Sequence, residues 1–259
     1  MEQGSLATHG DDSVSPVNSY TENADFWVKI IRENMDRYRS DLTDPAVLQA
    51  VGNIQGLRVL DAGCGEGYLS RILARQGANV TGLDACAELV DAAREEAQRE
   101  GLTIDHVTAD VAAIPIESAS LDLVVVNHVV TDLKDPEQPF REFGRVLKPG
   151  GRIVIMMLHP CFYSAQAERK ALRGYAEPTH YFSVRVVEQE FNVAGITSPA
   201  KVTMWFRPLE TYMDLLTQNG FVITTLNEPH PGPQVLAEDP WWHDNFVRPL
   251  FLLVTAERR

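Results

Sequence analysis

Cysteine and long apolar runs are both scarce in this sequence. The three cysteines are Cys64, Cys86 and Cys161, and no two of them form a CxxC pair. A zinc or redox motif is therefore not indicated, and so sparse a count is typical of a reducing cytoplasm. No apolar run reaches the roughly 18 residues that a membrane-spanning helix needs. The first 19 residues are polar without a secretory core, so we expect a mobile tail of a cytoplasmic, non-membrane protein.

Basic residues are also few. The chain has 23 Lys and Arg against 36 Asp and Glu, for a net charge of −13, and no basic run occurs. Nucleic-acid binders carry basic stripes, so this balance favours a small-molecule partner and argues against nucleic acid. The 259 residues are 44% hydrophobic, enough for one large α/β domain with an insertion. Composition leaves the oligomeric state open.

Short apolar stretches alternate with amphipathic helical stretches through the middle of the chain. Helical patterns precede them, over residues 24–38 and from Asp44 onward. Such alternation predicts a doubly wound, mostly parallel α/β sheet. The five expected strands of this stretch are residues 57–60, 79–83, 103–107, 121–126 and 152–158.

The alternation breaks after His159. Residues 181–191 and 201–206 read as two strands around a turn at 195–199, which predicts a cap inserted after the fifth strand. A helix over residues 209–219 follows, and strands at 221–226 and 250–255 complete a seven-stranded sheet. Between those last strands, residues 228–249 read as a Pro-rich and Trp-rich loop.

A glycine-rich turn joins the first strand to the next helix, in the order Asp61-Ala62-Gly63-Cys64-Gly65-Glu66-Gly67. Glycine lets the backbone turn sharply and lets a ligand approach closely. The helix that follows presents free N–H groups. Asp84 ends the next strand, where a carboxylate can accept both hydroxyls of a ribose. Together these features predict an adenosine-containing cofactor across the strand ends.

The spacing of the glycines discriminates between adenosine cofactors. A dinucleotide turn has the pattern GxGxxG, whereas Gly63, Gly65 and Gly67 form GxGxG. Asp61 and Glu66 would repel a pyrophosphate but suit a ligand with a cationic amino-acid end. The turn therefore favours S-adenosylmethionine over NAD, and an NAD-linked oxidoreductase on a similar sheet stays as the alternative.

Five motifs in order resemble those of the class I S-adenosylmethionine-dependent methyltransferases. They are residues 59–67 (VLDAGCGEG), 82–84 (GLD), 109–111 (ADV), 122–128 (DLVVVNH) and 145–151 (RVLKPGG). The resemblance covers about residues 57–158 and implies the seven-stranded, Rossmann-like methyltransferase fold. It also implies the division into parts: a tail (1–19), lid helices (20–56), a cofactor-binding core (57–158), a substrate cap (159–208) and the rest of the sheet (209–259).

The resemblance further implies which residues bind S-adenosylmethionine and its product S-adenosylhomocysteine. By position they are Gly63, Gly65 and Asp61 for the methionine part, Asp84 and Ala85 for the ribose, Asp110 and Val111 for the adenine, Asn127 and His128 under the sulfonium, and Tyr20 as an aromatic lid. His128 contributing only its backbone, and Tyr20 only packing, are open alternatives. A non-catalytic S-adenosylmethionine-binding protein would also carry such motifs, although there they are expected to be eroded.

The acceptor side is less legible. His159 follows the fifth strand directly, so we expect it at the ligand-binding edge as the first candidate for a general base, with Tyr20 as the second. A histidine that merely shapes the turn before Pro160 is the alternative. Aromatic residues outside the sheet would line an apolar acceptor pocket. They are Phe162, Tyr163, Tyr181, Trp241 and Trp242.

The expected reaction is methyl transfer to a small, aromatic metabolite, as in the tailoring of specialised metabolites. O-, N- and C-methylation stay open, and C-methylation of an indole is the most specific hypothesis. The histidines show no metal-ligand spacing, so no metal is expected.

Overall fold

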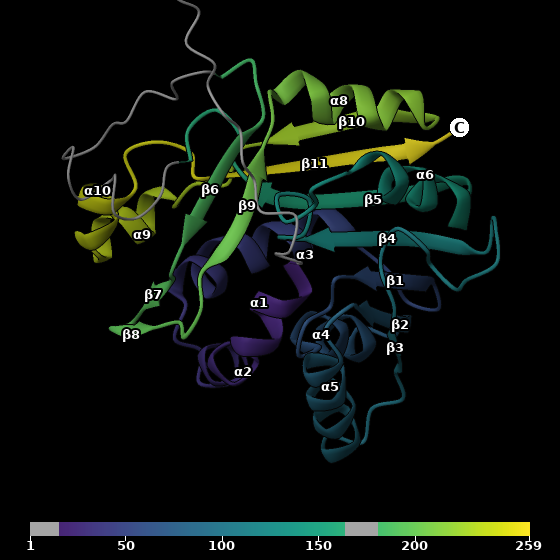
Figure 1. Ribbon diagram of the computed structural model, residues 1–259, viewed down its shortest axis with the longest axis horizontal. Helices are drawn as coiled ribbons and strands as arrows, with labels where there is room; N and C mark the ends of the chain where they lie inside the picture. Colours follow the sequence, from purple (N-terminus) through teal and green to yellow (C-terminus); the bar gives the residue numbers. More distant parts are fainter. Residues whose placement is uncertain (1–15, 164–180) are drawn as a thin grey trace, which may run out of the picture.

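The computed structural model describes residues 16–163 and 181–259, and its centre is a seven-stranded sheet in the order β10-β11-β5-β4-β1-β2-β3 (Figure 1). β11 runs antiparallel to both of its neighbours, and the pairs from β5 to β3 are parallel. The predicted doubly wound, mostly parallel sheet is therefore confirmed. Its strands are β1 (Arg58–Ala62), β2 (Asn79–Asp84), β3 (Asp105–Thr108), β4 (Leu121–Asn127), β5 (Leu147–Leu158), β10 (Phe221–Asn227) and β11 (Phe251–Arg258).

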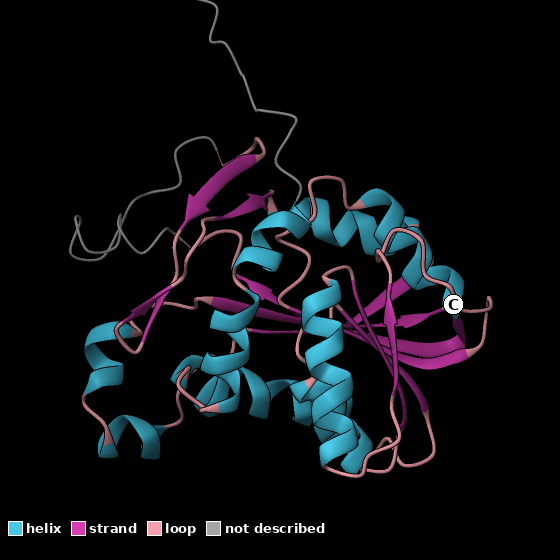
Figure 2. Ribbon diagram, turned by 60° about the horizontal axis from the view of Figure 1, so that its bottom comes forward, coloured by secondary structure: helices cyan, strands magenta, loops and turns pink. Residues whose placement is uncertain are grey.

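Helices cover both faces of this sheet, as Figure 2 shows. They are α1 (Pro16–Glu22), α2 (Ala24–Arg32), α3 (Asp44–Val51), α4 (Tyr68–Arg75), α5 (Ala87–Arg99), α6 (Glu137–Val146), α8 (Leu209–Gln218), α9 (Pro233–Glu238) and α10 (Trp241–Asn245), with the π-helix η1 (Arg39–Thr43) before α3.

The run of apolar residues in β4 explains why one strand serves two cores. Leu123 and Val125 belong to the core that α3 and α4 cover, whereas Val124 and Val126 belong to the core that α6 and α8 cover. Successive side chains of a strand point to opposite faces, so a strand with helices on both sides must be apolar throughout. All four side chains are fully buried.

The carboxyl ends of β1, β2 and β4 meet at one edge of the sheet. Ala62 pairs with Leu83 of β2 on one side and with Val126 of β4 on the other. The chain runs outward from β1 to β3 and then returns to β4, so the strand order reverses between β1 and β4. In open α/β sheets, ligands bind in the crevice outside such a reversal.

Two small sheets stand over this edge. β6 (Arg185–Gln189) pairs with β9 (Val202–Phe206), and the hairpin of β7 (Asn192–Val193) and β8 (Ile196–Thr197) extends from them. Strands were expected over residues 181–191 and 201–206, and the first is shorter than expected because residues 181–184 form a turn and a bend before β6 begins. Residues 164–180 of the expected cap lie outside the described residues.

Hydrogen bonds connect the junction of α1 and α2 to the loop between β8 and β9. The side chain of Asn23 donates from Nδ2 to the carbonyl of Ala200 (3.0 Å) and accepts from the Ala200 N–H (2.8 Å). Such a two-way bond between an amide side chain and a backbone unit fixes the position of α1 and α2 against the cap.

Three expectations about local structure were wrong. Helix α1 begins at Pro16, so Tyr20 lies within a helix and not after a tail that runs to residue 19. The helix expected over residues 24–38 ends at Arg32, because Asn34 takes a left-handed conformation with φ +51°. The Asp36 carboxylate then accepts the N–H groups of Tyr38 (3.0 Å) and Arg39 (3.3 Å) and starts a new turn. The loop expected at 228–249 contains α9 and α10.

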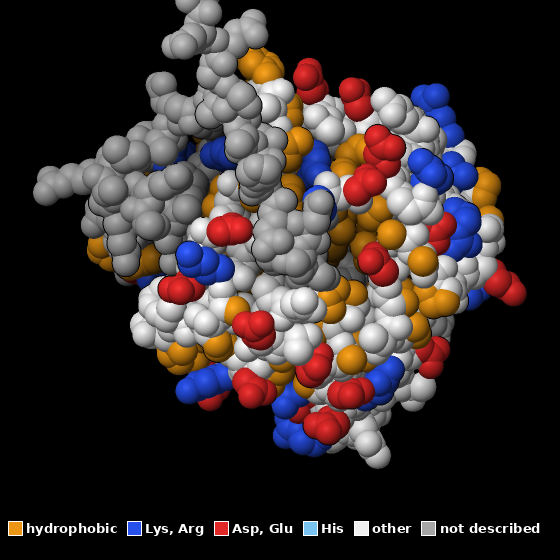
Figure 3. Space-filling view, viewed as in Figure 1, with side chains coloured by type: hydrophobic (Ala, Val, Ile, Leu, Met, Phe, Trp, Pro, Cys, Tyr) orange, Lys and Arg blue, Asp and Glu red, His pale blue; other side chains and the backbone are white. Residues whose placement is uncertain are grey.

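Across residues 16–163 and 181–259, no helix combines the length and the apolar character that crossing a bilayer requires. Over the same residues, no three histidine, cysteine, aspartate or glutamate side chains gather as potential metal ligands. Acidic, basic and apolar side chains are interspersed on the face seen in Figure 3.

Candidate active site

A cavity of about 960 Å³ opens at the carboxyl edge of the sheet. Ligand pockets in proteins span about 300–1,000 Å³, so this one can hold two small molecules together. Its walls include every residue that the resemblance assigned to the cofactor. These are Tyr20, Asp61, Gly63, Gly65, Asp84, Ala85, Asp110, Val111, Asn127 and His128.

Two glycines of the turn after β1 have different physical roles. Gly63 has φ +78°, and an added Cβ would lie 2.2 Å from Cγ2 of Val129, so its missing side chain allows close packing. Gly65 has φ +54°, and an added Cβ would meet no atom within 4 Å. Because Gly65 lines the cavity, its missing side chain leaves space for a ligand to approach the backbone.

Backbone and hydroxyl groups hold two carboxylates in the cavity wall. Oδ2 of Asp84 accepts the Gly65 N–H (2.8 Å), and Oδ1 accepts the Cys86 N–H (2.9 Å). Asp61 accepts the hydroxyl of Ser70 (2.6 Å). Burial raises the pKa of both carboxyls, to about 6 for Asp61. Each carboxylate oxygen can accept more than one hydrogen bond, so both groups retain capacity for a ligand.

Glu66 does not act as the sequence argument supposed. Its carboxylate is fully buried and pairs with Arg71 (3.0 Å) and with Arg32 of α2 (3.2 Å). Two guanidinium groups neutralise this charge, so Glu66 cannot attract the cationic end of a ligand as Asp61 can. Its bond to Arg32 instead ties the lid helix α2 to the glycine turn.

A hydrogen-bonded chain runs from β4 to the lid. Asn127 donates from Nδ2 to the hydroxyl of Tyr68 (2.8 Å), which donates to Oδ1 of Asp44 (3.0 Å). Arg39 donates to Oδ2 of Asp44 (2.8 Å), and its guanidinium lies 4.6 Å from the centre of the Tyr68 ring. Burial raises the pKa of Asp44 to about 6. The sequence argument missed Tyr68 and Arg39, both of which line the cavity.

Two residues of this hydrogen-bonded series each have a buried polar atom without a hydrogen-bond partner. Within the described ranges, Oδ1 of Asn127 and Nε of Arg39 are buried without a hydrogen-bond partner. A buried polar atom without a partner costs about 1–3 kcal/mol. Both residues line the cavity, so a ligand with a donor and an anionic group would satisfy both atoms.

His128 has an uncommon backbone conformation. Its φ is +60°, and its N–H donates to the carbonyl of Met156 (2.8 Å). Burial lowers the pKa of its imidazole to about 4, so the ring is neutral at physiological pH. The ring stands edge-on to Phe251 at 5.5 Å between centres. His128 therefore shapes the cavity wall without adding charge to it.

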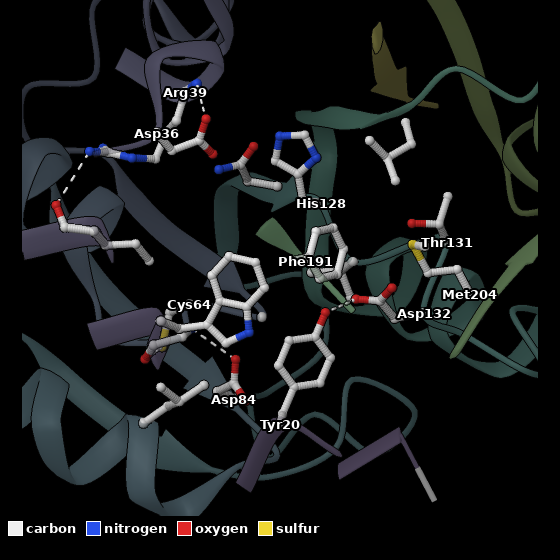
Figure 4. Close-up of a pocket in the computed structure, with 18 of the residues that line it drawn as sticks. Tyr20, Asp36, Arg39, Cys64, Asp84, His128, Thr131, Asp132, Phe191 and Met204 are labelled. Carbon is white, nitrogen blue, oxygen red and sulfur yellow. Dashed lines mark hydrogen bonds between the residues drawn. The ribbon is translucent and has the colours of Figure 1, made fainter. Parts of the chain in front are cut away.

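Tyr20 and Asp132 form a pair on the other side of the cavity. The Tyr20 hydroxyl of α1 donates to Oδ2 of Asp132 at 2.6 Å, as the dashed line in Figure 4 shows. Burial raises the pKa of Asp132 to about 7, against the opposing effect of the Tyr20 hydrogen bond. Burial also raises the pKa of Tyr20 above its ordinary range. Sequence reasoning missed Asp132, although it follows the end of β4 by five residues.

The residues expected to bind the acceptor divide into two groups. Tyr163 and Trp241 line the cavity. Phe162, Tyr181 and Trp242 do not line it among the residues that the structure describes, so their expected role is not supported. Trp242 is only 1% exposed, because it packs against Tyr38 in the core that α3 and α4 cover. The cavity wall includes apolar residues that the sequence did not indicate, namely Trp27, Phe191 and Met204.

His159 is a structural residue in this arrangement. Its side chain is buried, Nε2 lies 3.0 Å from Oε1 of Glu228, and Nδ1 accepts the Cys161 N–H (3.2 Å). Both ring nitrogens thus have partners, and His159 is not among the described residues that line the cavity. The expectation that His159 is the first candidate base is therefore corrected, since a base must reach the proton that it removes.

Comparisons with known proteins identify relatives of this chain. The family described as a methyltransferase domain matches residues 60–155. A ubiquinone biosynthesis O-methyltransferase of Methylocella silvestris is 36% identical over 191 residues, which cover 71% of this chain and 75% of that protein. One of Coxiella burnetii with the same name is 30% identical over 59% of this chain and 62% of its own length.

Solved structures are similar over more of the chain. An S-adenosylmethionine-dependent methyltransferase from Mesorhizobium loti has a TM-score of 0.66 and 28% identity, and it matches over 83% of this chain and 96% of its own. A structure described as a putative methyltransferase of this kind from Listeria monocytogenes has a TM-score of 0.68 at 22% identity, over 83% of this chain and 96% of its own, which shows the fold alone.

Proposed function

Because the chain belongs to the class I S-adenosylmethionine-dependent methyltransferases, we propose that it methylates a small aromatic acceptor in the apolar part of the cavity. The observation that carries the proposal is the cavity itself. It joins the carboxylates and glycines of the sheet edge to a compartment lined by Trp27, Phe191 and Met204. One continuous space of this kind can bring a polar cofactor and an apolar acceptor into contact.

The cavity walls fit the cofactor. Open space at Gly65 lets a ligand approach the backbone. The unpartnered Oδ1 of Asn127 can accept a hydrogen bond from a ligand donor, and the unpartnered Nε of Arg39 can donate to an anionic group. An amino acid carries both, as its ammonium and its carboxylate. Asp61 would share the ammonium with Asn127, and Arg39 would hold the carboxylate. Asp84 would take the ribose, beside Ala85.

The remaining contacts would follow the same line along the sheet edge. Asp110 and Val111 would hold the adenine, at a point where Oδ1 of Asp110 already accepts the Ala112 N–H (2.8 Å). When bound, S-adenosylmethionine supplies a methyl group on positively charged sulfur, already activated for attack. This chain therefore mainly has to align the acceptor, and positioning can contribute roughly 7–11 kcal/mol.

The lid and cap would exclude water from the reacting groups. Arg32 joins α2 to the glycine turn, and Asn23 joins the same amino-terminal region to Ala200. Trp27 and Phe191, which touch at 5.2 Å between ring centres, come from these two parts and close the apolar compartment together. A dry site favours transfer, because charge is dispersed as the sulfonium becomes a neutral thioether.

The acceptor class follows from two arguments. Relatives at 30–36% identity are named O-methyltransferases, which supports a hydroxyl as the atom that receives the methyl group. The indole hypothesis depended on an acceptor pocket rich in aromatic residues, and three of the five that were expected there, Phe162, Tyr181 and Trp242, are not among the described residues that line the cavity. We therefore place a phenol or a related hydroxyl compound before an indole carbon. The net charge of −13 supports a small molecule over nucleic acid.

Labelled methyl transfer tests the proposal. The wild-type protein is incubated with methyl-labelled S-adenosylmethionine and a matched panel of phenols, catechols and indoles, and the products are identified by mass spectrometry. We expect labelled methyl ethers. Asp84→Ala serves as the control, because it removes the proposed ribose contact and should abolish the label. Label on an indole carbon alone would replace the hydroxyl assignment, and no labelled small molecule from an active cofactor-binding preparation would contradict the proposal.

A further inference from the structure

Asp132 lies in the segment between β4 and α6, and its two carboxyl oxygens differ in their hydrogen bonds. Oδ2 of Asp132 accepts the Tyr20 hydroxyl at 2.6 Å. Oδ1 has no hydrogen bond to any residue that the structure describes. Asp132 and Leu133 of the same segment line the cavity, and Figure 4 shows Asp132 near Thr131 and near Met204 of β9. One oxygen is thus fixed by the protein, and the other is available in the cavity.

The surroundings of Asp132 suit a group that takes up protons near neutral pH. Burial raises its pKa to about 7, the Tyr20 hydrogen bond lowers it, and the charge of Asp84 on β2 raises it. Burial raises the pKa of Tyr212 on α8, and the charge of Asp132 adds to this effect. A general base works best when its pKa lies near the operating pH, since it is then both ionised and basic.

Resting on the proposed function, we propose that Asp132 is the general base for the acceptor hydroxyl, with Oδ1 taking the proton while Tyr20 positions the carboxylate through Oδ2. In the reaction, the acceptor oxygen forms a bond to the methyl carbon as the bond from that carbon to sulfur breaks. The electron pair of the broken bond stays on sulfur, and the hydroxyl proton moves to Oδ1 of Asp132. No oxidant or reductant is needed.

The other two candidates for the base are less suitable. Tyr20 donates a hydrogen bond to Asp132, and burial raises the pKa of its phenol above the ordinary range, so little phenolate is present. His159 has both ring nitrogens engaged, by Glu228 and by the Cys161 N–H. An aspartate base also fits the acceptor class, because a hydroxyl loses a proton on methylation.

The test combines Asp132→Asn with Tyr20→Phe. Asp214→Asn is the matched control, because it removes the same charge at an exposed position on α8. Infrared difference spectra of the protein alone follow the carboxyl group. We expect a carboxylic acid band that titrates near pH 7 in the wild type and in Asp214→Asn. The band should be absent in Asp132→Asn and should titrate at higher pH in Tyr20→Phe, because the hydrogen bond that lowers the pKa is lost.

Turnover of the phenol that the wild type methylates gives the second readout. Asp132→Asn should lower kcat by roughly 10²–10⁴-fold and lose the rise of rate with pH. Tyr20→Phe should shift that rise to higher pH and recover rate there, which a purely structural role would not produce. Affinity for S-adenosylhomocysteine should stay within about threefold, or under about 0.7 kcal/mol, of the wild-type value in both.

The outcomes separate the two claims. A wild-type protein that methylates no small molecule contradicts the proposed function, and the role of Asp132 falls with it. An active wild type with Asp132→Asn unchanged in kcat overturns the role of Asp132 alone. Loss of S-adenosylhomocysteine binding in Asp132→Asn would also overturn it, because the residue would then serve the cofactor and not the acceptor proton.

Discussion

Gly65→Ala tests whether the open space beside the glycine turn is where the cofactor lies. Gly65 has φ +54°, and an added Cβ meets no protein atom within 4 Å. Gly101, which ends α5, is a matched control with φ +68° and equally open surroundings. Each alanine costs about 1–2 kcal/mol in the left-handed conformation, offset by about 0.4–1 kcal/mol from the stiffer unfolded chain. Both variants should therefore unfold about 2–4 °C below the wild type.

Of these two glycines, Gly65 lines the cavity and Gly101 does not, so the two variants should differ in cofactor binding. A methyl group placed in occupied space costs about 1–3 kcal/mol, which corresponds to roughly 5- to 150-fold in Kd. Calorimetry with S-adenosylhomocysteine measures this directly. Gly101→Ala should bind like the wild type, and Gly65→Ala should bind more weakly by that factor. Equal affinity in the two variants would refute the reasoning.

Three other predictions follow from the contacts of the site. Arg32→Ala frees α2 from Glu66, so S-adenosylhomocysteine should dissociate about fivefold faster in stopped-flow fluorescence, whereas Arg141→Ala, which breaks an exposed hydrogen bond to Gln138 on α6, should not change the rate. Asp132→Asn should gain about 1–3 kcal/mol of stability at pH 8 but not at pH 4, as measured by denaturant unfolding. The pKa of Asp132 is about 7 in the folded protein and lower in the unfolded chain, so ionisation of Asp132 between pH 4 and pH 8 destabilises the wild type. His159→Ala should lose about 1–3 kcal/mol of stability with kcat nearly unchanged, and a large fall in kcat at unchanged stability would restore its role as a base.

The part of the cavity wall that comes from the sheet was predictable because its residues lie at or just after the ends of strands. Asp61, Asp84 and Asn127 close β1, β2 and β4, and parallel strands carry their carboxyl ends to one edge. Strand order and strand ends together therefore bring these residues into one wall. The local patterns of apolar residues and glycine mark the strand ends, so the sequence alone can indicate the site.

The part of the cavity wall that comes from outside the sheet was not predictable in the same way. Arg39 comes from a helix before the sheet, and its position depends on how that helix folds back over the sheet. The left-handed conformation of Asn34 interrupts the helix expected over residues 24–38, and the Asp36 carboxylate then accepts the N–H groups of Tyr38 and Arg39 in a new turn. A periodic pattern records which residues are apolar, but it does not record such a break.

Charged and aromatic residues were misjudged for a related reason. Glu66 looked like a free carboxylate next to Asp61, but Arg71 reaches it from the following helical turn. Trp242 was expected to line an acceptor pocket, but α10 forms at this point and the ring lies in the core. In both cases a partner distant in the sequence also takes part, namely Arg32 of α2 for Glu66 and Tyr38 for Trp242.

A crystal structure with S-adenosylhomocysteine tests the central claim most directly. The account predicts that the ribose hydroxyls bond to Asp84, that the adenine lies beside Asp110, and that the amino-acid end satisfies Oδ1 of Asn127 and Nε of Arg39. It also predicts that the sulfur faces the compartment that contains Asp132. A ligand bound elsewhere, or one whose amino-acid end points toward Asp110, would contradict the account.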